Sequence, residues 1–258
     1  MFLSRLHVNV ANDPGRLWLR NLYHVHQRLC MAFPSASRKS DDPDFLRPFK
    51  SQDFGGNQVR VARNAHPDVA CKTEADFAGF LFRIDPHPAG RVVILVQSVL
   101  KPDWDYAFHN AGYLLAPPSQ VAAPWEVKEF GPRLLCRTGA TWRFRLRANP
   151  TVKREEKRHA LLSEEEQTAW LRRKADAGGF AVLSVTASRE GSRAARKTDH
   201  NAPKPKEHRI SLFAVRFDGV LKVTDDEAFL RSLCCGIGSA KGLGFGLLSL
   251  ARAGQWTT

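Results

Sequence analysis

The 258-residue sequence predicts an α+β fold made of two successive βαββαβ units. Three observations predict this fold: short apolar runs that indicate strands, apolar residues at helical spacing that indicate helices, and the same order of elements in both halves. A chain of this length can form two domains of about 100–130 residues, each with its own core. We therefore expect two tandem ferredoxin-like (RRM-like) domains, residues 1–138 and 139–258. This expectation rests on element order, because the halves show no convincing residue-by-residue repeat.

The first half opens with a strand and a long amphipathic helix. Asp13 and Pro14 are typical of an N-cap followed by proline at the first helical position. Apolar residues then recur at helical spacing, as at Leu22, Val25 and Leu29. The expected elements are strand 2–10, helix 14–31, a long loop from 34 to about 74, strands 77–85 and 91–99, a weak helix within 103–115, and strand 127–136.

The second half repeats this order. Its first helix begins at a capping box, in which Ser163 is followed three residues later by Glu166. The expected elements are strand 142–148, helix 163–177, strands 180–187 and 209–223, helix 225–235, a glycine-rich stretch over 236–246 and strand 245–251.

Composition excludes several classes of protein. No run of 18 apolar residues is present, so we expect no membrane-spanning helix, and Arg5, His7 and Asn9 interrupt the apolar core that a signal peptide needs. The five cysteines are scattered and form no C-x-x-C pair, which argues against a disulfide framework and a zinc site. We expect a reduced, cytoplasmic protein with no metal and no cofactor. The cysteines are Cys30, Cys71, Cys136, Cys234 and Cys235.

The net charge of +13, from 39 basic and 26 acidic residues, indicates a polyanionic partner, nucleic acid before membrane. The alternative is a basic protein that binds no polyanion. The charge is concentrated in two segments. Residues 142–158 hold seven basic and two acidic residues, a net of +5, and residues 189–209 hold seven and three, a net of +4. Together they supply nine of the thirteen excess charges.

Three arginines in the first segment alternate with apolar residues. On a strand this pattern places Arg143, Arg145 and Arg147 on one face, about 6.6 Å apart, which is close to the spacing of successive phosphates. Guanidinium groups bind phosphate through two hydrogen bonds at once. The pattern therefore favours a phosphate-binding face, and the alternative is a half-buried strand whose outer face is arginine.

The second segment is a basic connection between two strands. Gly191, Pro203 and Pro205 exclude a helix there, so we interpret it as a flexible finger or an extended hairpin that follows a phosphate backbone. The alternative is a solvated loop. Its basic residues are Arg189, Arg193, Arg196, Lys197, Lys204, Lys206 and Arg209.

The glycine-rich stretch also fits contact with an anion. Gly238, Gly242 and Gly244 allow close approach of the backbone and exposure of N–H groups, and Lys241 supplies a point charge. The order of residues is not that of a P-loop. A purely structural turn is the alternative.

The first helix carries the candidate catalytic pair. Tyr23 and His26 are three residues apart and share a helix face, among Arg16, Arg20 and Arg28. A histidine with a pKa near neutrality can transfer protons while a ribose 2′-OH attacks the adjacent phosphate, a reaction that needs no metal. From spacing alone, an inert surface histidine is the commoner case.

The sequence resembles the CasE-type CRISPR repeat endoribonucleases, the RNA-processing subunits of the type I-E Cascade complex. Five blocks carry the resemblance, in the family's order and over nearly the whole chain, and the last is the strongest. They are Met-Phe-Leu-Ser-Arg at 1–5, Leu-Tyr-His-Val-His-Gln-Arg-Leu at 22–29, Phe-Arg-Leu-Arg-Ala-Asn-Pro at 144–150, Ala-Trp-Leu-Arg-Arg-Lys at 169–174, and the glycine-rich block at 236–250.

The resemblance implies two ferredoxin-like domains that grip a CRISPR repeat hairpin and cut precursor RNA at the base of its stem. It implies metal-independent cleavage, retention of the CRISPR RNA product and assembly with other Cascade subunits. His26 matches the family's catalytic histidine, Tyr23 its assisting tyrosine, and 189–209 its groove-entering hairpin. The stretch 35–74 is longer than the family's pattern. The alternative hypotheses are a non-catalytic RNA-binding assembly subunit and a DNA-binding accessory protein.

Overall fold

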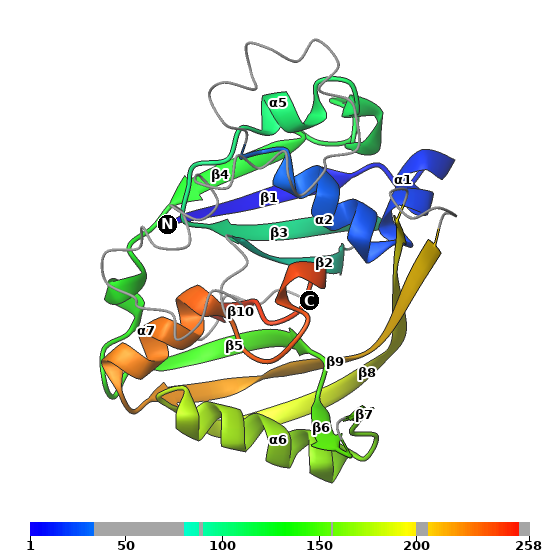
Figure 1. Ribbon diagram of the computed structural model, residues 1–258. Helices are drawn as coiled ribbons and strands as arrows, with labels where there is room; N and C mark the ends of the chain where they lie inside the picture. Colours follow the sequence, from blue (N-terminus) through cyan, green and yellow to red (C-terminus); the bar gives the residue numbers. More distant parts are fainter. Residues whose placement is uncertain (34–79, 88–89, 156, 200–205, 253–258) are drawn as a thin grey trace. The chain divides into compact units, whose positions relative to one another are not determined.

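The computed structural model describes residues 1–33, 80–87, 90–155, 157–199 and 206–252 (Figure 1). Within these residues the fold is α+β with two four-stranded sheets. No helix in this part of the chain is long and apolar enough to cross a membrane. The expected loop from 34 to about 74 lies outside the described residues.

The chain divides into two compact units that are not contiguous in sequence. The first holds the described parts of 1–67, 82–130 and 194–210, and the second those of 68–81, 131–193 and 211–258. One change of unit comes between residues 130 and 131. The assignment of 194–210 to the first unit is a feature that the order of elements does not reveal.

The first sheet contains β1 (Phe2–Val8), β2 (Phe80–His87), β3 (Arg91–Ser98) and β4 (Trp125–Glu129), in the order β2-β3-β1-β4. Strand β1 is antiparallel to both of its neighbours, so Leu6 lies opposite Ile94 and Trp125. Leu6 and Ile94 are fully buried. The expected strand 127–136 ends early, because Gly131 and Pro132 start a short 3-10 helix, η3 (Pro132–Leu135). Proline has no N–H to donate to a strand ladder.

The expected single helix over 14–31 is two helices, α1 (Asp13–Leu19) and α2 (Leu22–Cys30). The N-cap of α1 is Asn12 and not Asp13, because the Asn12 side chain accepts a hydrogen bond from the Gly15 N–H at 2.8 Å. The weak helix expected within 103–115 is α5 (Trp104–Phe108) followed by η2 (Gly112–Leu114). Aromatic rings hold α1 and α5 together, since Trp18 and Phe108 meet edge to face with centroids 6.0 Å apart.

The second sheet contains β5 (Thr141–Ala148), β8 (Phe180–Asp199), β9 (Lys206–Val223) and β10 (Leu248–Ala251), in the order β10-β5-β9-β8. If the four strands of each sheet are numbered in chain order, the two sheets have the same strand order. Strand β5 is antiparallel to β9 and β10. Strands β8 and β9 are longer than expected, because most of the basic connection is strand (Figure 1). Strand β10 is shorter, beginning at Leu248.

Two helices of the second half pack on this sheet. Helix α6 (Glu164–Ala177) begins at the expected capping box of Ser163 and Glu166, and its Trp170 stacks on Phe217 of β9 at 6.2 Å between centroids. Helix α7 (Asp226–Cys235) places Phe229 edge to face with Phe180 at 5.6 Å. A small sheet of β6 (Thr151–Arg154) and β7 (Lys157–Ala160) was not expected; it contains part of the first basic segment.

Candidate functional site

Helix α2 carries Tyr23 and His26 and is fixed by its apolar face. Val25 and Leu29 are fully buried, whereas Tyr23 and His26 are partly exposed. The helix begins at Asn21, whose Oδ1 accepts a hydrogen bond from the Tyr23 N–H at 3.2 Å. Both candidate catalytic side chains therefore lie on one short helix with a defined start.

The imidazole of His26 lies close to a thiol of the same helix. Its Nε2 lies 3.5 Å from the Sγ of Cys30, one helical turn further on. Burial lowers the pKa of His26 to about 4, because an imidazolium loses hydration there. At neutral pH the ring is thus uncharged and able to accept a proton.

The cations expected around this helix have different environments. Arg16 pairs with Asp13 and donates to the Val10 carbonyl at 2.8 Å, and Arg28 donates to the Ala107 carbonyl at 3.1 Å. Arg20 is exposed at the end of α1. Only part of the expected positive charge is therefore directed to solvent.

The ends of β8 and β9 that belong to the first unit, residues 194–199 and 206–210 among those described, are called the basic arm below. Asn21 contacts this arm. Its Nδ2 donates to the Arg196 carbonyl at 3.1 Å, and its Oδ1 accepts from the Arg196 N–H at 3.0 Å. Sequence reasoning missed Asn21; the signal was an asparagine, a preferred N-cap, inside the apolar pattern of the expected long helix.

The basic connection is an extended hairpin over its described part. Arg189 and Arg193 in β8 belong to the second unit and are exposed; Arg196 in β8 and Arg209 in β9 belong to the first unit and are also exposed. Lys197 and Lys206 are strand residues, and Lys204 lies outside the described residues. The sequence left open a finger, a hairpin or a solvated loop; in the structure the described residues of the connection lie in the neighbouring strands β8 and β9, as a hairpin requires.

The arginine face of β5 differs from the expectation. Asp218 lies directly opposite Arg145 in the β5–β9 register and binds its Nε at 2.5 Å. Arg147 is only 6% exposed and is held by Glu190 of β8. Arg143 is exposed, and within the described residues no ion pair is formed by it.

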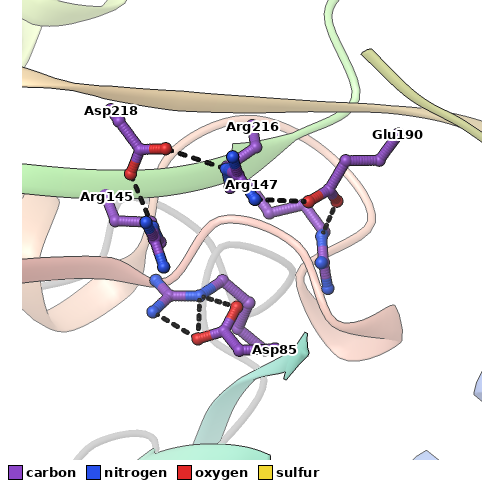
Figure 2. A network of polar contacts seen from close by, with 7 residues as sticks. Asp85, Arg145, Arg147, Glu190, Arg216 and Asp218 are labelled. Carbon is purple, nitrogen blue, oxygen red and sulfur yellow. Dashed lines mark hydrogen bonds and ion pairs between the residues drawn. The ribbon is translucent and has the colours of Figure 1, made fainter. Parts of the chain in front are cut away.

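These contacts form one polar network (Figure 2). Arg216 of β9 joins it, with its Nε 2.8 Å from Asp218 and its Nη1 3.7 Å from Glu190. Two carboxylates therefore neutralise most of the charge of three arginines. Alternation along β5 predicts Arg145 and Arg147 but not these acidic partners, which lie on other strands. Of the three β5 arginines, Arg143 alone is placed as a solvent-facing phosphate ligand would be.

The glycine-rich stretch is a tight loop with left-handed backbone. Gly238 and Gly244 have φ of 87° and 84°, and Ala240 shares the left-handed region at 61°. The loop is closed by the Ile237 N–H, which donates to the Gly246 carbonyl at 2.9 Å. Gly242 lies in the short helix η4 (Lys241–Leu243), which Lys241 starts. The glycines thus meet a structural requirement, and the loop leaves Lys241 partly exposed.

Within the described residues, no group of three or more His, Cys, Asp or Glu side chains is placed to hold a metal ion.

Comparison with known proteins identifies the family. The sequence model of the family described as CRISPR associated protein matches residues 1–252. The chain belongs to this CRISPR-associated protein family. A family relative, the CRISPR-associated endoribonuclease Cse3 of Thermus thermophilus, is 30% identical over 97% of this chain and 100% of the relative. The Cascade subunit CasE of Escherichia coli is 26% identical over 97% of this chain and 99% of its own length.

The fold of this CRISPR-associated chain agrees with a solved structure. Thermus thermophilus Cse3 bound to an RNA representing a pre-cleavage complex superimposes with a TM-score of 0.62 at 27% identity, covering 97% of this chain and 98% of that one. The resemblance that the sequence blocks indicated is thereby confirmed at the level of the family, over the full length of the chain.

Proposed function

We propose that this chain binds the hairpin of CRISPR repeat RNA and cleaves precursor CRISPR RNA at the base of the stem, as an RNA-processing subunit of Cascade. Full-length homology to an endoribonuclease and to a Cascade subunit supports the proposal. The observation that carries it is the placement of Tyr23 and His26 on α2, in the same compact unit as the basic arm.

The chemistry follows from the state of His26. In the proposed step, the neutral imidazole takes the proton of a ribose 2′-OH, and that oxygen attacks the adjacent phosphorus. The bond from phosphorus to the 5′-oxygen breaks, and this oxygen takes up a proton as it leaves. The products are a 2′,3′-cyclic phosphate and a 5′-hydroxyl. The nucleophile belongs to the substrate, so the step does not require a metal-bound water.

Tyr23 is proposed to orient the scissile phosphate or assist proton transfer. His26 can also serve as the acid that protonates the leaving oxygen. The low pKa of His26 favours the base, since an imidazole that is neutral at pH 7 is ready to accept a proton but not to donate one.

Binding is proposed to rest on phosphate contacts, because guanidinium groups pair well with phosphate and an A-form stem presents its backbone along a regular path. Arg145 and Arg147 are proposed to support RNA binding from within the network of ion pairs beside β5. They contact phosphate only if they exchange their carboxylate partners for it. The proposed direct ligands are Arg143, Arg189, Arg193, Arg196, Lys197, Lys204, Lys206, Arg209, Lys241 and the backbone at Gly238, Gly242 and Gly244.

Each half is proposed to be a ferredoxin-like domain. Both sheets repeat one strand order, and in each half an N-terminal strand is followed by a helix. This order is that of a βαββαβ unit folded into a four-stranded antiparallel sheet.

Single-turnover cleavage of a repeat hairpin, with and without EDTA, tests the function. We expect wild-type cleavage to continue in EDTA, and His26→Ala to cleave about 10²–10⁴-fold more slowly while still binding the hairpin. Wild-type activity that disappears with EDTA would contradict the mechanism, as would a His26→Ala variant as fast as wild type. Binding by wild type without scission would instead identify a non-catalytic assembly subunit.

A further inference from the structure

Strand β8 has an unusual partner on its outer side. Among the described residues it is the edge strand of the second sheet, so the N–H and C=O groups on that side have no neighbouring strand in this part of the chain. The N–H and C=O of one residue point to the same side of a strand. At Arg196 both bind the amide of Asn21, at 3.0 and 3.1 Å. The side chain thus takes the place of a strand neighbour, because an amide offers the same acceptor and donor as a peptide group.

The same side chain starts the helix that carries the candidate catalytic pair. Asn21 Oδ1 also accepts from the Tyr23 N–H, so one oxygen holds both the start of α2 and the edge of β8. The arm is packed as well as hydrogen-bonded at this point, since Ala195 is only 3% exposed. Asn21, Tyr23, Ala195 and Arg196 all belong to the first unit.

We propose that Asn21 is a positioning residue for RNA cleavage, because it fixes the basic arm to the start of α2 and so sets where arm-bound RNA lies relative to His26. This inference rests on the proposed function. The arm carries exposed cations: the guanidinium of Arg196 faces Glu207 only loosely, at 3.9 Å with both side chains more than half exposed, and Arg209 is exposed too. An arm released from Asn21 keeps these cations but loses its fixed distance to the helix.

The consequence is specific to the chemical step. Phosphate contacts made by an undocked arm still give affinity, whereas the scissile phosphate is no longer held in one place. Small misplacements of a reacting group cost much of the rate. We therefore expect loss of Asn21 to lower the cleavage rate at saturating RNA, and to spread the cut over neighbouring nucleotides, more than it weakens binding.

The test uses two substitutions in the full chain. Asn21→Ser keeps an N-cap side chain for α2 but is too short to reach both backbone groups of Arg196. Asn21→Asp keeps the acceptor for the Arg196 N–H and loses the donor to its carbonyl. The matched control is Asn12→Ser, because Asn12 caps α1 in the same way and its Nδ2 donates to the Tyr113 carbonyl at 2.8 Å, with no hydrogen bond to the described residues of the arm. Thermal unfolding shows that each variant is folded.

The measurements are single-turnover cleavage of hairpin RNA at saturation, the position of the cut at nucleotide resolution, and hydrogen exchange of the Arg196 amide. We expect Asn21→Ser to cleave about tenfold more slowly or worse, because the two hydrogen bonds that hold Arg196 are lost and the scissile phosphate is misplaced. Asn21→Asp should lie between this variant and wild type, and Asn12→Ser should match wild type.

The inference is overturned if Asn21→Ser cleaves at the wild-type rate and position, or if Asn12→Ser loses as much activity. Failure of the proposed function is distinguishable, because wild type would then bind without cleaving. In that case hydrogen exchange tests whether Asn21 fixes the basic arm to α2. Equal exchange of the Arg196 amide in wild type and Asn21→Ser would overturn the inference.

Discussion

Glu190 on β8 holds the guanidinium of Arg147 on β5, and the two side chains are only 12% and 7% exposed. The same carboxylate lies 3.7 Å from Nη1 of Arg216. One largely buried carboxylate thus serves two arginines on different strands. Breaking such a buried pair is costly, because the remaining charge keeps its burial but loses its partner.

Replacing this carboxylate is therefore expected to destabilise the fold. Glu190→Gln should lower the free energy of unfolding by about 3 kcal/mol, measured by urea denaturation. Glu126→Gln is the control, since Glu126 pairs with Arg5 at 2.7 Å where the side chains are 55% and 46% exposed. That substitution should cost less than about 1 kcal/mol. Similar losses in the two variants would contradict a structural role for the Glu190 pair.

The pH dependence of cleavage should separate the two roles of His26. Burial lowers its pKa to about 4, so the imidazole of the free protein is neutral above that pH. If it acts as the base, kcat/KM rises as pH increases through this pKa and then levels off towards neutrality. A rate that instead falls steadily above pH 4 would assign His26 as the acid.

The same shift predicts that stability depends on pH. Between pH 6.5 and about 4 the unfolded chain protonates His26 while the folded chain does not. Protonation thus favours unfolding, and stability should fall as pH decreases through this window. The slope of the unfolding free energy against pH reports how many more protons the unfolded chain binds than the folded chain. His26→Gln should lower this number by up to one. Some slope should remain, since burial also lowers the pKa of His7. An unchanged slope would show that the pKa of His26 is not lowered in the folded chain.

The glycine-rich loop should tolerate alanine poorly. Gly246 has φ of 85°, and an added Cβ would lie 2.9 Å from the Ile237 carbonyl oxygen. Gly139 has a similar φ of 87° but open space around the same position. Gly139→Ala should cost about 1–2 kcal/mol of stability from backbone strain alone. Gly246→Ala should cost a further ~1–3 kcal/mol from the steric conflict. Equal thermal unfolding of the two variants would count against the loop geometry.

The exposed arginines of β8 and β9 should determine the salt dependence of RNA binding. Replacing Arg193 and Arg209 with alanine should weaken binding and lower the slope of log affinity against log salt by about 1 per lost phosphate contact. Arg173 on α6 and Arg231 on α7 are exposed arginines outside the proposed interface, and their double replacement is charge-matched. If both double variants change the slope equally, binding depends on net charge and not on these two strands.

Local patterns in the sequence predicted most of the elements. Periodicity located the four strands of each half, and the capping box at Ser163 located the start of α6, because these signals depend on residues close together in the chain. The break between α1 and α2 was missed. The apolar pattern runs across Asn21 without interruption, and only the contacts of its side chain make it the start of a new helix.

The remaining differences come from contacts between distant residues. Alternation along β5 predicted three arginines on one face, but the partner of Arg145 is Asp218, 73 residues away. Strand β8 extends through Gly191, which favours a loop, because pairing between β8 and β9 outweighs local preference. Sequence reasoning therefore located the charge correctly but not the carboxylates that balance part of it.

The assignment of residues 194–210 to the first unit limits how relatives can be recombined. A chimera joined between residues 138 and 139 takes Asn21 from one parent and Arg196 from the other. In this chimera α2 and the basic arm come from different parents, although each half is intact in sequence. Functional exchange between homologues should therefore require that Asn21 and the arm be inherited together, as one unit split across two stretches of the gene.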